Sequence, residues 1–250
     1  MASSEARRRK QLEKKKKKRT EKQKELTQHR SAGMAVQLGR KSSAPVYKCI
    51  VSNLIDSKGI GVVYFSRILD SGEVICVAFL VDRYCRGVAD CFVRTYTRIS
   101  FDEMLEDMTK RGHSWSQKDA ATTRRLIEDA AAYATAAGVA CHKDYRACKE
   151  IFGTVDPAAA ETIYEMGKNG KPFYIPGPHT TMPEIQKVLA RLTERFGESG
   201  FDHLLPLGGA STLNTMGLSD GEEYDEDFND DDYEDDHVHG PGCGHDHDHG

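Results

Sequence analysis

The chain has 250 residues, of which 38% are hydrophobic and 30% charged, and its formal net charge is −4. No apolar run reaches the roughly 20 residues that a membrane-spanning helix needs, and no apolar signal segment follows the first methionine, so we expect a cytoplasmic protein without a membrane partner. Residues 1–41 carry fifteen Lys/Arg against four Glu, whereas residues 220–250 carry fourteen Asp/Glu and no Lys/Arg. This split predicts a basic arm over 1–41, a single globular domain over 42–218 and an acidic, His-rich tail over 219–250.

The basic arm is rich in helix-forming residues but poor in apolar ones, with only Leu12 and Leu26 between residues 7 and 30. A helix in this stretch has no apolar face to bury, so we expect a disordered or helical extension. Dense Lys/Arg without aromatic residues suits phosphate contacts rather than base stacking, which favours RNA or the ribosome as a partner bound without sequence preference. The alternative is a solvated extension that aids solubility. The candidate nucleic-acid contacts are Arg7, Arg8, Arg9, Lys10, Lys14, Lys15, Lys16, Lys17, Lys18 and Arg19.

The globular part begins with four segments rich in Val, Ile, Phe, Tyr and Cys, each bounded by turn residues. These segments predict strands over 47–54, 60–69, 73–82 and 89–97. Short connections between them favour an antiparallel meander. The third strand is apolar on both alternations from Val74 to Val81, so we expect both of its faces to be covered.

Helices are expected to follow the strands, which makes the fold class α+β. Capping boxes at Ser100 and Glu103, at Ser116 and Asp119, and at Thr181 and Glu184 mark three helix starts. Asp156 before a proline marks a fourth, at a short helix ending near residue 166. The expected helical ranges are 100–110, 116–137, 143–152, 157–166 and 182–196.

The corner between the third and fourth strands combines cysteines, carboxylates and arginines within residues 82–91. Arg83 and Arg86 would favour a thiolate at Cys85, which makes this cysteine a candidate nucleophile. A base would have to come from a distant histidine. The candidate catalytic residues are Cys85, Asp82, Asp90 and His179.

Two other interpretations of this corner are open. In the first, the two aspartates bond loop amides and arginines while Cys85 packs in the core. In the second, Cys85 joins Cys91, Cys141 and His142 in a zinc site, although the chain has no Cys-x-x-Cys pair.

A proline-rich segment over 171–179 predicts a rigid extended stretch, because proline fixes φ and restricts the residue before it. One interpretation is a ligand-facing loop that presents Lys171, Tyr174 and His179 beside the helix that begins after residue 181. The other is a connector in which Phe173 and Ile175 fill the core.

The corner and this segment together carry a resemblance. The stretch Phe79-Leu80-Val81-Asp82-Arg83-Tyr84-Cys85-Arg86-Gly87-Val88-Ala89-Asp90 and the later Gly170-Lys171-Pro172-Phe173-Tyr174-Ile175-Pro176-Gly177-Pro178 resemble a family of uncharacterised bacterial proteins. Some members of that family look to carry a SEC-C zinc motif, whose cysteine cluster this chain lacks. The resemblance spans residues 48–205 and implies a shared fold but no reaction. It places these residues on the family's motif positions: Asp82, Cys85, Gly87, Asp90, Lys171, Pro172, Phe173, Gly177 and Pro178.

The tail is nearly all acidic from residue 220 to 236 and cannot bury enough apolar surface to fold alone. Imidazole and thiolate groups with flexible glycine spacing suit a divalent transition metal, Zn²⁺ or Ni²⁺. The tail is also expected to fold back on the basic arm and compete with nucleic acid. The candidate ligands are His237, His239, Cys243, His245, His247 and His249.

These features favour a cytoplasmic binding or adaptor protein that contacts RNA or a ribonucleoprotein through its basic arm, with a metal-chelating tail. Two other classes remain open. One is an enzyme centred on Cys85 with an unknown substrate, and the other is a metal carrier or sensor that uses the tail. The sequence does not decide whether the protein is an enzyme.

Overall fold

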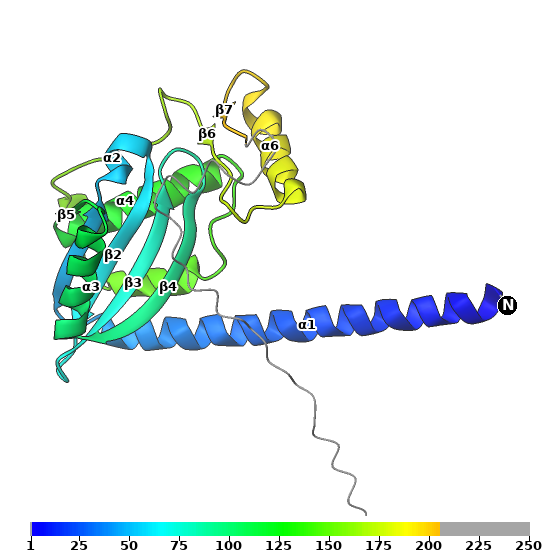
Figure 1. Ribbon diagram of the computed structural model, residues 1–250, viewed down its shortest axis with the longest axis horizontal. Coiled ribbons are helices and arrows are strands. Elements are labelled where there is room, and N and C mark those ends of the chain that lie inside the picture. The colour runs from blue at the N-terminus through cyan, green and yellow to red at the C-terminus, as the bar shows by residue number, and fades with distance from the viewer. Residues whose placement is uncertain (1, 206–250) are drawn as a thin grey trace, which may run out of the picture. The chain divides into compact units, whose positions relative to one another are not determined.

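A five-stranded antiparallel sheet forms the centre of the fold in the computed structural model, which describes residues 2–205 and the side chains of residues 14–22 and 24–205 (Figure 1). The strand order is β4-β3-β2-β1-β5. The strands are β1 (Val46–Ser52), β2 (Ile60–Ile68), β3 (Glu73–Asp82), β4 (Gly87–Thr97) and β5 (Trp115–Gln117). The predicted four-stranded meander is therefore present as β1 to β4, and the α+β class is confirmed.

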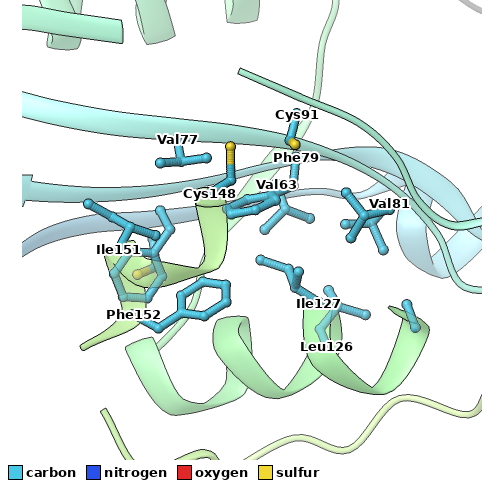
Figure 2. Close-up of a cluster of buried hydrophobic side chains, with 14 of the residues drawn as sticks. Val63, Val77, Phe79, Val81, Cys91, Leu126, Ile127, Cys148, Ile151 and Phe152 are labelled. Atoms are coloured by element: carbon cyan, nitrogen blue, oxygen red, sulfur yellow. The ribbon is translucent and has the colours of Figure 1, made fainter. Parts of the chain in front are cut away.

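Both faces of β3 are buried, as its double apolar alternation predicts. Val77 and Phe79 lie in the main core with Leu126 and Ile127 of α4 (Ala120–Ala136). On the opposite face, strand residues cluster around Phe101 of α3 (Arg98–Lys110). Figure 1 shows these two helices on opposite sides of the sheet, and Figure 2 shows the main core between the strands and α4. The sheet is thus a middle layer between two layers of helix.

The N-terminal helix α1 (Ala2–Lys41) runs through the whole predicted arm into the domain. Its last turns pack on the core: Leu38 is 1% exposed and Met34 packs against the main cluster. Upstream, Ser31 donates a hydrogen bond to Asp144. The helix contacts α5 (Tyr145–Cys148) and the following 3-10 turn η1 (Lys149–Phe152). The basic arm is thereby joined to the domain by a continuous helix rather than by a loop.

Several element boundaries differ from the sequence expectation. Thr97, not Ser100, caps α3 by accepting the Ser100 N–H, and Asp119, not Ser116, caps α4 by accepting the Thr122 N–H. Residue 116 instead belongs to β5, which pairs with residues 50–52 of β1. The expected helix over 157–166 is only the short turn η2 (Pro157–Ala159). The fourth strand begins at residue 87, two residues earlier than expected.

A smaller layer closes one end of the domain. It holds α6 (Met182–Phe196), with the expected Thr181–Glu184 capping box, and the parallel pair β6 (Phe173–Tyr174) and β7 (Asp202–His203). Its core is a second cluster that includes Cys85, Tyr174 and Leu192. One further short helix, α2 (Leu54–Lys58), connects β1 and β2. No helix in the described residues is long and apolar enough to span a membrane.

Candidate functional site

The basic part of α1 is exposed to solvent over its described length. Between residues 14 and 30 the sequence has nine Lys/Arg and two Glu, and of the side chains described there only Thr27 is half-buried. Successive helical residues point about 100° apart, so the six consecutive cations of residues 14–19 surround the helix axis. No single side of this segment is acidic or apolar. The segment is therefore a cationic rod about 25 Å long from residue 14 to residue 30.

The base of this rod is fixed by a narrow docking stripe. Thr27, Ser31, Met34 and Leu38 recur at three- and four-residue spacing, which places them on one face of the helix. These four residues are buried or half-buried, and the stripe ends at Thr27. Arg7, Arg8, Arg9 and Lys10 lie on the backbone of α1, but their side chains are outside the described part of the structure. The candidates Lys14, Lys15, Lys16, Lys17, Lys18 and Arg19 are all exposed.

The predicted thiolate at Cys85 is corrected by the structure. Cys85 is fully buried in the second cluster, and burial raises the pKa of its thiol to about 12. Arg86 opposes this shift, but nearby Asp82 adds to it. Arg83 points elsewhere: its guanidinium donates to the carbonyl of Ile55 at 2.9 Å and lies 4.7 Å from the Tyr84 ring centre. Cys85 thus behaves as a packing residue in this geometry.

Asp82 has a structural role: its side chain holds the turn between β3 and β4 in place. Its carboxylate accepts the backbone N–H groups of Tyr84 at 2.9 Å and Cys85 at 3.1 Å. The side chain is 3% exposed, and burial raises its pKa to about 6 in spite of those two hydrogen bonds. Asp90 lies further along on β4, where it is exposed and accepts the Cys91 N–H at 2.7 Å. The interpretation in which the aspartates bond loop amides while Cys85 packs describes this corner.

This environment gives Asp82→Asn a pH-dependent effect on stability. A carboxyl whose pKa is higher in the folded state than in the unfolded state stabilises the fold most when protonated, so wild type loses stability as the pH rises from about 4 to 6. The asparagine amide oxygen can accept the same two N–H groups without ionising. We expect the variant to gain about 3 kcal/mol relative to wild type between pH 4 and 7, measured by urea unfolding. Asp90→Asn, at an exposed carboxyl, is the matched control; parallel curves for all three proteins would contradict the burial argument.

A cysteine and a histidine do meet at this corner, but the cysteine is Cys91. Its Sγ lies 3.5 Å from His142 Nδ1, and His142 Nε2 lies 3.6 Å from a carboxylate oxygen of Asp90. This order of thiol, imidazole and carboxylate has the connectivity of a nucleophile, base and orienting group. However, Cys91 is only 4% exposed. A hydrogen bond with the Cys148 thiol, together with burial, raises the pKa of the Cys91 thiol. Figure 2 shows Cys91 and Cys148 among the apolar side chains of the main core. The arrangement thus favours a neutral, packed thiol.

The structure gives no support to the alternative of a zinc site at Cys85, Cys91, Cys141 and His142. Cys85 belongs to the second cluster and Cys91 to the main one. Within the described part of the chain, no group of three or more His, Cys, Asp or Glu side chains is placed to hold a metal ion. The tail ligands His237, His239, Cys243, His245, His247 and His249 lie outside the described residues.

The proline-rich segment is mostly a connector. Tyr174 is 1% exposed and packs in the second cluster, so it fills the core in place of the expected Phe173 and Ile175, which are half-buried. Lys171 Nζ donates to the Ser199 carbonyl at 2.9 Å. Of the three side chains expected to face a ligand, only His179 is exposed without a hydrogen bond of its own in the described residues.

Comparisons with known proteins give no further guide to function. No family model, no curated protein and no solved structure matches the chain significantly. The functional argument therefore depends on the residues themselves, and the exposed cations of α1 are the strongest feature among them.

Proposed function

We propose that the protein is a cytoplasmic binding protein that contacts RNA, or a ribonucleoprotein, through the phosphate groups of the nucleic-acid backbone. One observation carries the proposal: a solvent-exposed cationic helix whose other end is packed on a folded domain. An extension that served solubility alone would need neither the docking stripe nor so large an excess of positive over negative charge. The folded domain then holds one end of the helix and fixes its direction.

The charge arrangement favours contact with phosphates rather than with bases. Residues 14–30 contain no Phe, Tyr or Trp on which a base could stack. Lysine ammonium groups, which make up most of the cations, are point charges without the planar fork that arginine offers to a guanine edge. Binding through such groups releases counterions and therefore weakens steeply as salt is added. We infer a partner bound with little sequence preference.

Like charges at four-residue spacing also repel one another and destabilise the free helix. Lys14 and Lys18, Lys15 and Arg19, and Lys18 and Lys22 are such pairs. Each pair destabilises an exposed helix by roughly 0.2–0.5 kcal/mol, and a polyanion between them removes the repulsion. Phosphate binding and helix stability thus favour each other in this segment.

The test is neutralisation of three helix cations. We expect K16Q/K17Q/K18Q to weaken binding to an RNA hairpin of arbitrary sequence and to make the slope of log K against log salt shallower by about 2 to 3, because each lost contact removes about 0.7–0.9. Glutamine keeps a high helix propensity, so the helix itself should persist. Fluorescence anisotropy across a salt series measures both quantities.

The matched control places the same change on the domain surface. Lys58, Lys110 and Lys187 are exposed and lie outside α1. K58Q/K110Q/K187Q removes the same net charge, so it should keep the wild-type slope. Equal slopes for the helix variant and this control would refute α1 as the contact element.

A further inference from the structure

A second row of cations lies on the segment against which α1 packs. Lys143, Arg146 and Lys149 recur at three-residue spacing from just before α5 into η1, and all three are exposed. The intervening Ala147 and Cys148 are buried, so the segment presents the three cations and one carboxylate, Glu150, to solvent and its apolar side chains to the core. In the described residues, none of the three cations forms an ion pair with a carboxylate.

This row adjoins the cationic part of α1. The helix contacts both α5 and η1, and Ser31 bonds directly to Asp144. Arg30 and Lys143 are the sequence neighbours of those two bonded residues, and both are exposed. Asp144, the one carboxylate between Lys143 and Arg146, is engaged by the serine hydroxyl. Exposed positive charge therefore continues from the helix onto the domain.

The side chains of this combined surface suit double-stranded rather than single-stranded nucleic acid. Proteins that hold single strands rely on aromatic platforms for the bases. Here the aromatic side chain of the row, Tyr145, is half-buried and packs edge-on against Phe79, with ring centres 6.5 Å apart. A duplex instead offers one phosphate charge per roughly 1.7 Å of its axis, with its bases already stacked on each other. A rod of about 25 Å would face roughly 15 such charges.

We infer that the row of Lys143, Arg146 and Lys149 and the basic part of α1 form one surface that binds the phosphate backbone of double-stranded nucleic acid. This inference rests on the proposed function, since it assumes that α1 binds phosphates. Beyond the proposed function, the inference states that cations of the folded domain also contact the phosphates and that the partner is double-stranded. Base-paired RNA and duplex DNA share this backbone chemistry.

The experiment compares four forms of the full chain: wild type, the helix variant K16Q/K17Q/K18Q, the row variant K143Q/R146Q/K149Q, and the surface control K58Q/K110Q/K187Q. The probes are a 20-bp RNA duplex, a 20-bp DNA duplex of the same sequence and a 20-nucleotide oligouridine. We expect the row variant to bind either duplex at least tenfold more weakly than wild type, with a salt slope shallower by about 2 to 3. Wild type should bind at least one duplex at least tenfold more tightly than oligouridine.

The outcomes separate this inference from the proposed function. If the helix variant is weakened but the row variant matches the surface control, α1 binds alone and the inference fails. If oligouridine binds as tightly as both duplexes, the duplex preference fails. If wild type binds none of the probes, the proposed function itself fails. Because the three row side chains make no hydrogen bond within the described residues, the row variant should keep the wild-type urea midpoint, and this check excludes unfolding as the cause of weak binding.

Discussion

Replacing Arg67 by methionine is expected to lower the free energy of unfolding by about 4 kcal/mol, because it removes the donor from two buried carbonyls and a half-buried one at once. Arg67 lies on β2 and is 4% exposed. Its guanidinium donates to the carbonyls of Ile151 at 2.6 Å, Phe152 at 2.7 Å and Ala44. These acceptors belong to η1 and to the link between α1 and β1. Burial lowers the pKa of this arginine. Its guanidinium carbon lies over the Phe65 ring, 5.5 Å from the ring centre.

Two opposing terms decide the size of this effect. Removing a buried charge restores part of its desolvation cost, whereas each carbonyl left without a donor costs about 1–3 kcal/mol. With three acceptors, the second term wins. Arg94→Met is the matched control, since Arg94 is exposed on β4 and lies over Phe92. It should change stability by less than about 1 kcal/mol. Urea unfolding followed by far-ultraviolet circular dichroism measures both, and equal losses would contradict a specific role for Arg67.

This arginine also bears on the proposed function. Ala44 lies three residues after the end of α1, and η1 is one of the elements that α1 contacts. The same guanidinium thus ties together the link that leaves the cationic helix and the surface on which that helix docks. Loss of these Arg67 hydrogen bonds should loosen the packing of the C-terminal end of α1 before it affects the sheet.

The strands could be predicted because their residues carry the information locally. Val, Ile and Phe dominate the interior strand β3, and its double apolar pattern matches the two clusters that cover it. The amphipathic helix α6 could be predicted for the same reason, with Ile185 and Leu192 on its buried side. In both cases the pattern repeats over several turns or residues within one segment.

The elements that were missed depend on partners far away in the sequence. β5 has three residues and exists because the edge of β1 offers them hydrogen bonds. Beyond η2, the rest of the helix expected over 157–166 is irregular chain, whose N–H groups at Glu161 and Thr162 donate to the buried hydroxyl of Thr122. The hydroxyl satisfies donors that a helix would otherwise satisfy. A single sequence shows no sign of either contact.

The candidate sites divide in the same way. The exposed cations of α1 follow directly from composition, because a segment with a large excess of positive charge and very few apolar residues stays in water. The contact between Cys91 and His142 joins residues 51 positions apart, and the sequence favoured Cys85 only because two arginines are its neighbours. The docking stripe around Met34 and Leu38 has few apolar residues, so its pattern is too short to separate from the polar arm. Adjacency in sequence was a poor guide to adjacency in space at this corner.

Gly87→Ala is the second change with a large expected effect, about 3 kcal/mol of lost stability. Gly87 begins β4 with φ of 65°, and a Cβ there would lie 2.8 Å from the Ala130 carbonyl oxygen of α4 and 2.8 Å from the Ala134 Cβ. The backbone of α4 cannot move aside cheaply, because Ala130 and Ala134 are both fully buried. This close approach gives the glycine of the strand corner a physical role: it lets α4 pack directly on the turn that Asp82 organises.

The control separates the two causes of that loss. Gly72 has φ of 83°, but a Cβ at this position would meet no described atom within 4 Å, so Gly72→Ala carries the conformational cost alone, about 1 kcal/mol. The difference between the two variants in urea unfolding then measures the steric overlap with α4. A difference of about 2 kcal/mol supports close packing of helix and corner. Equal losses would mean that α4 can shift away from the corner, and the burial of Asp82 and Cys85 would then depend on other contacts than this helix.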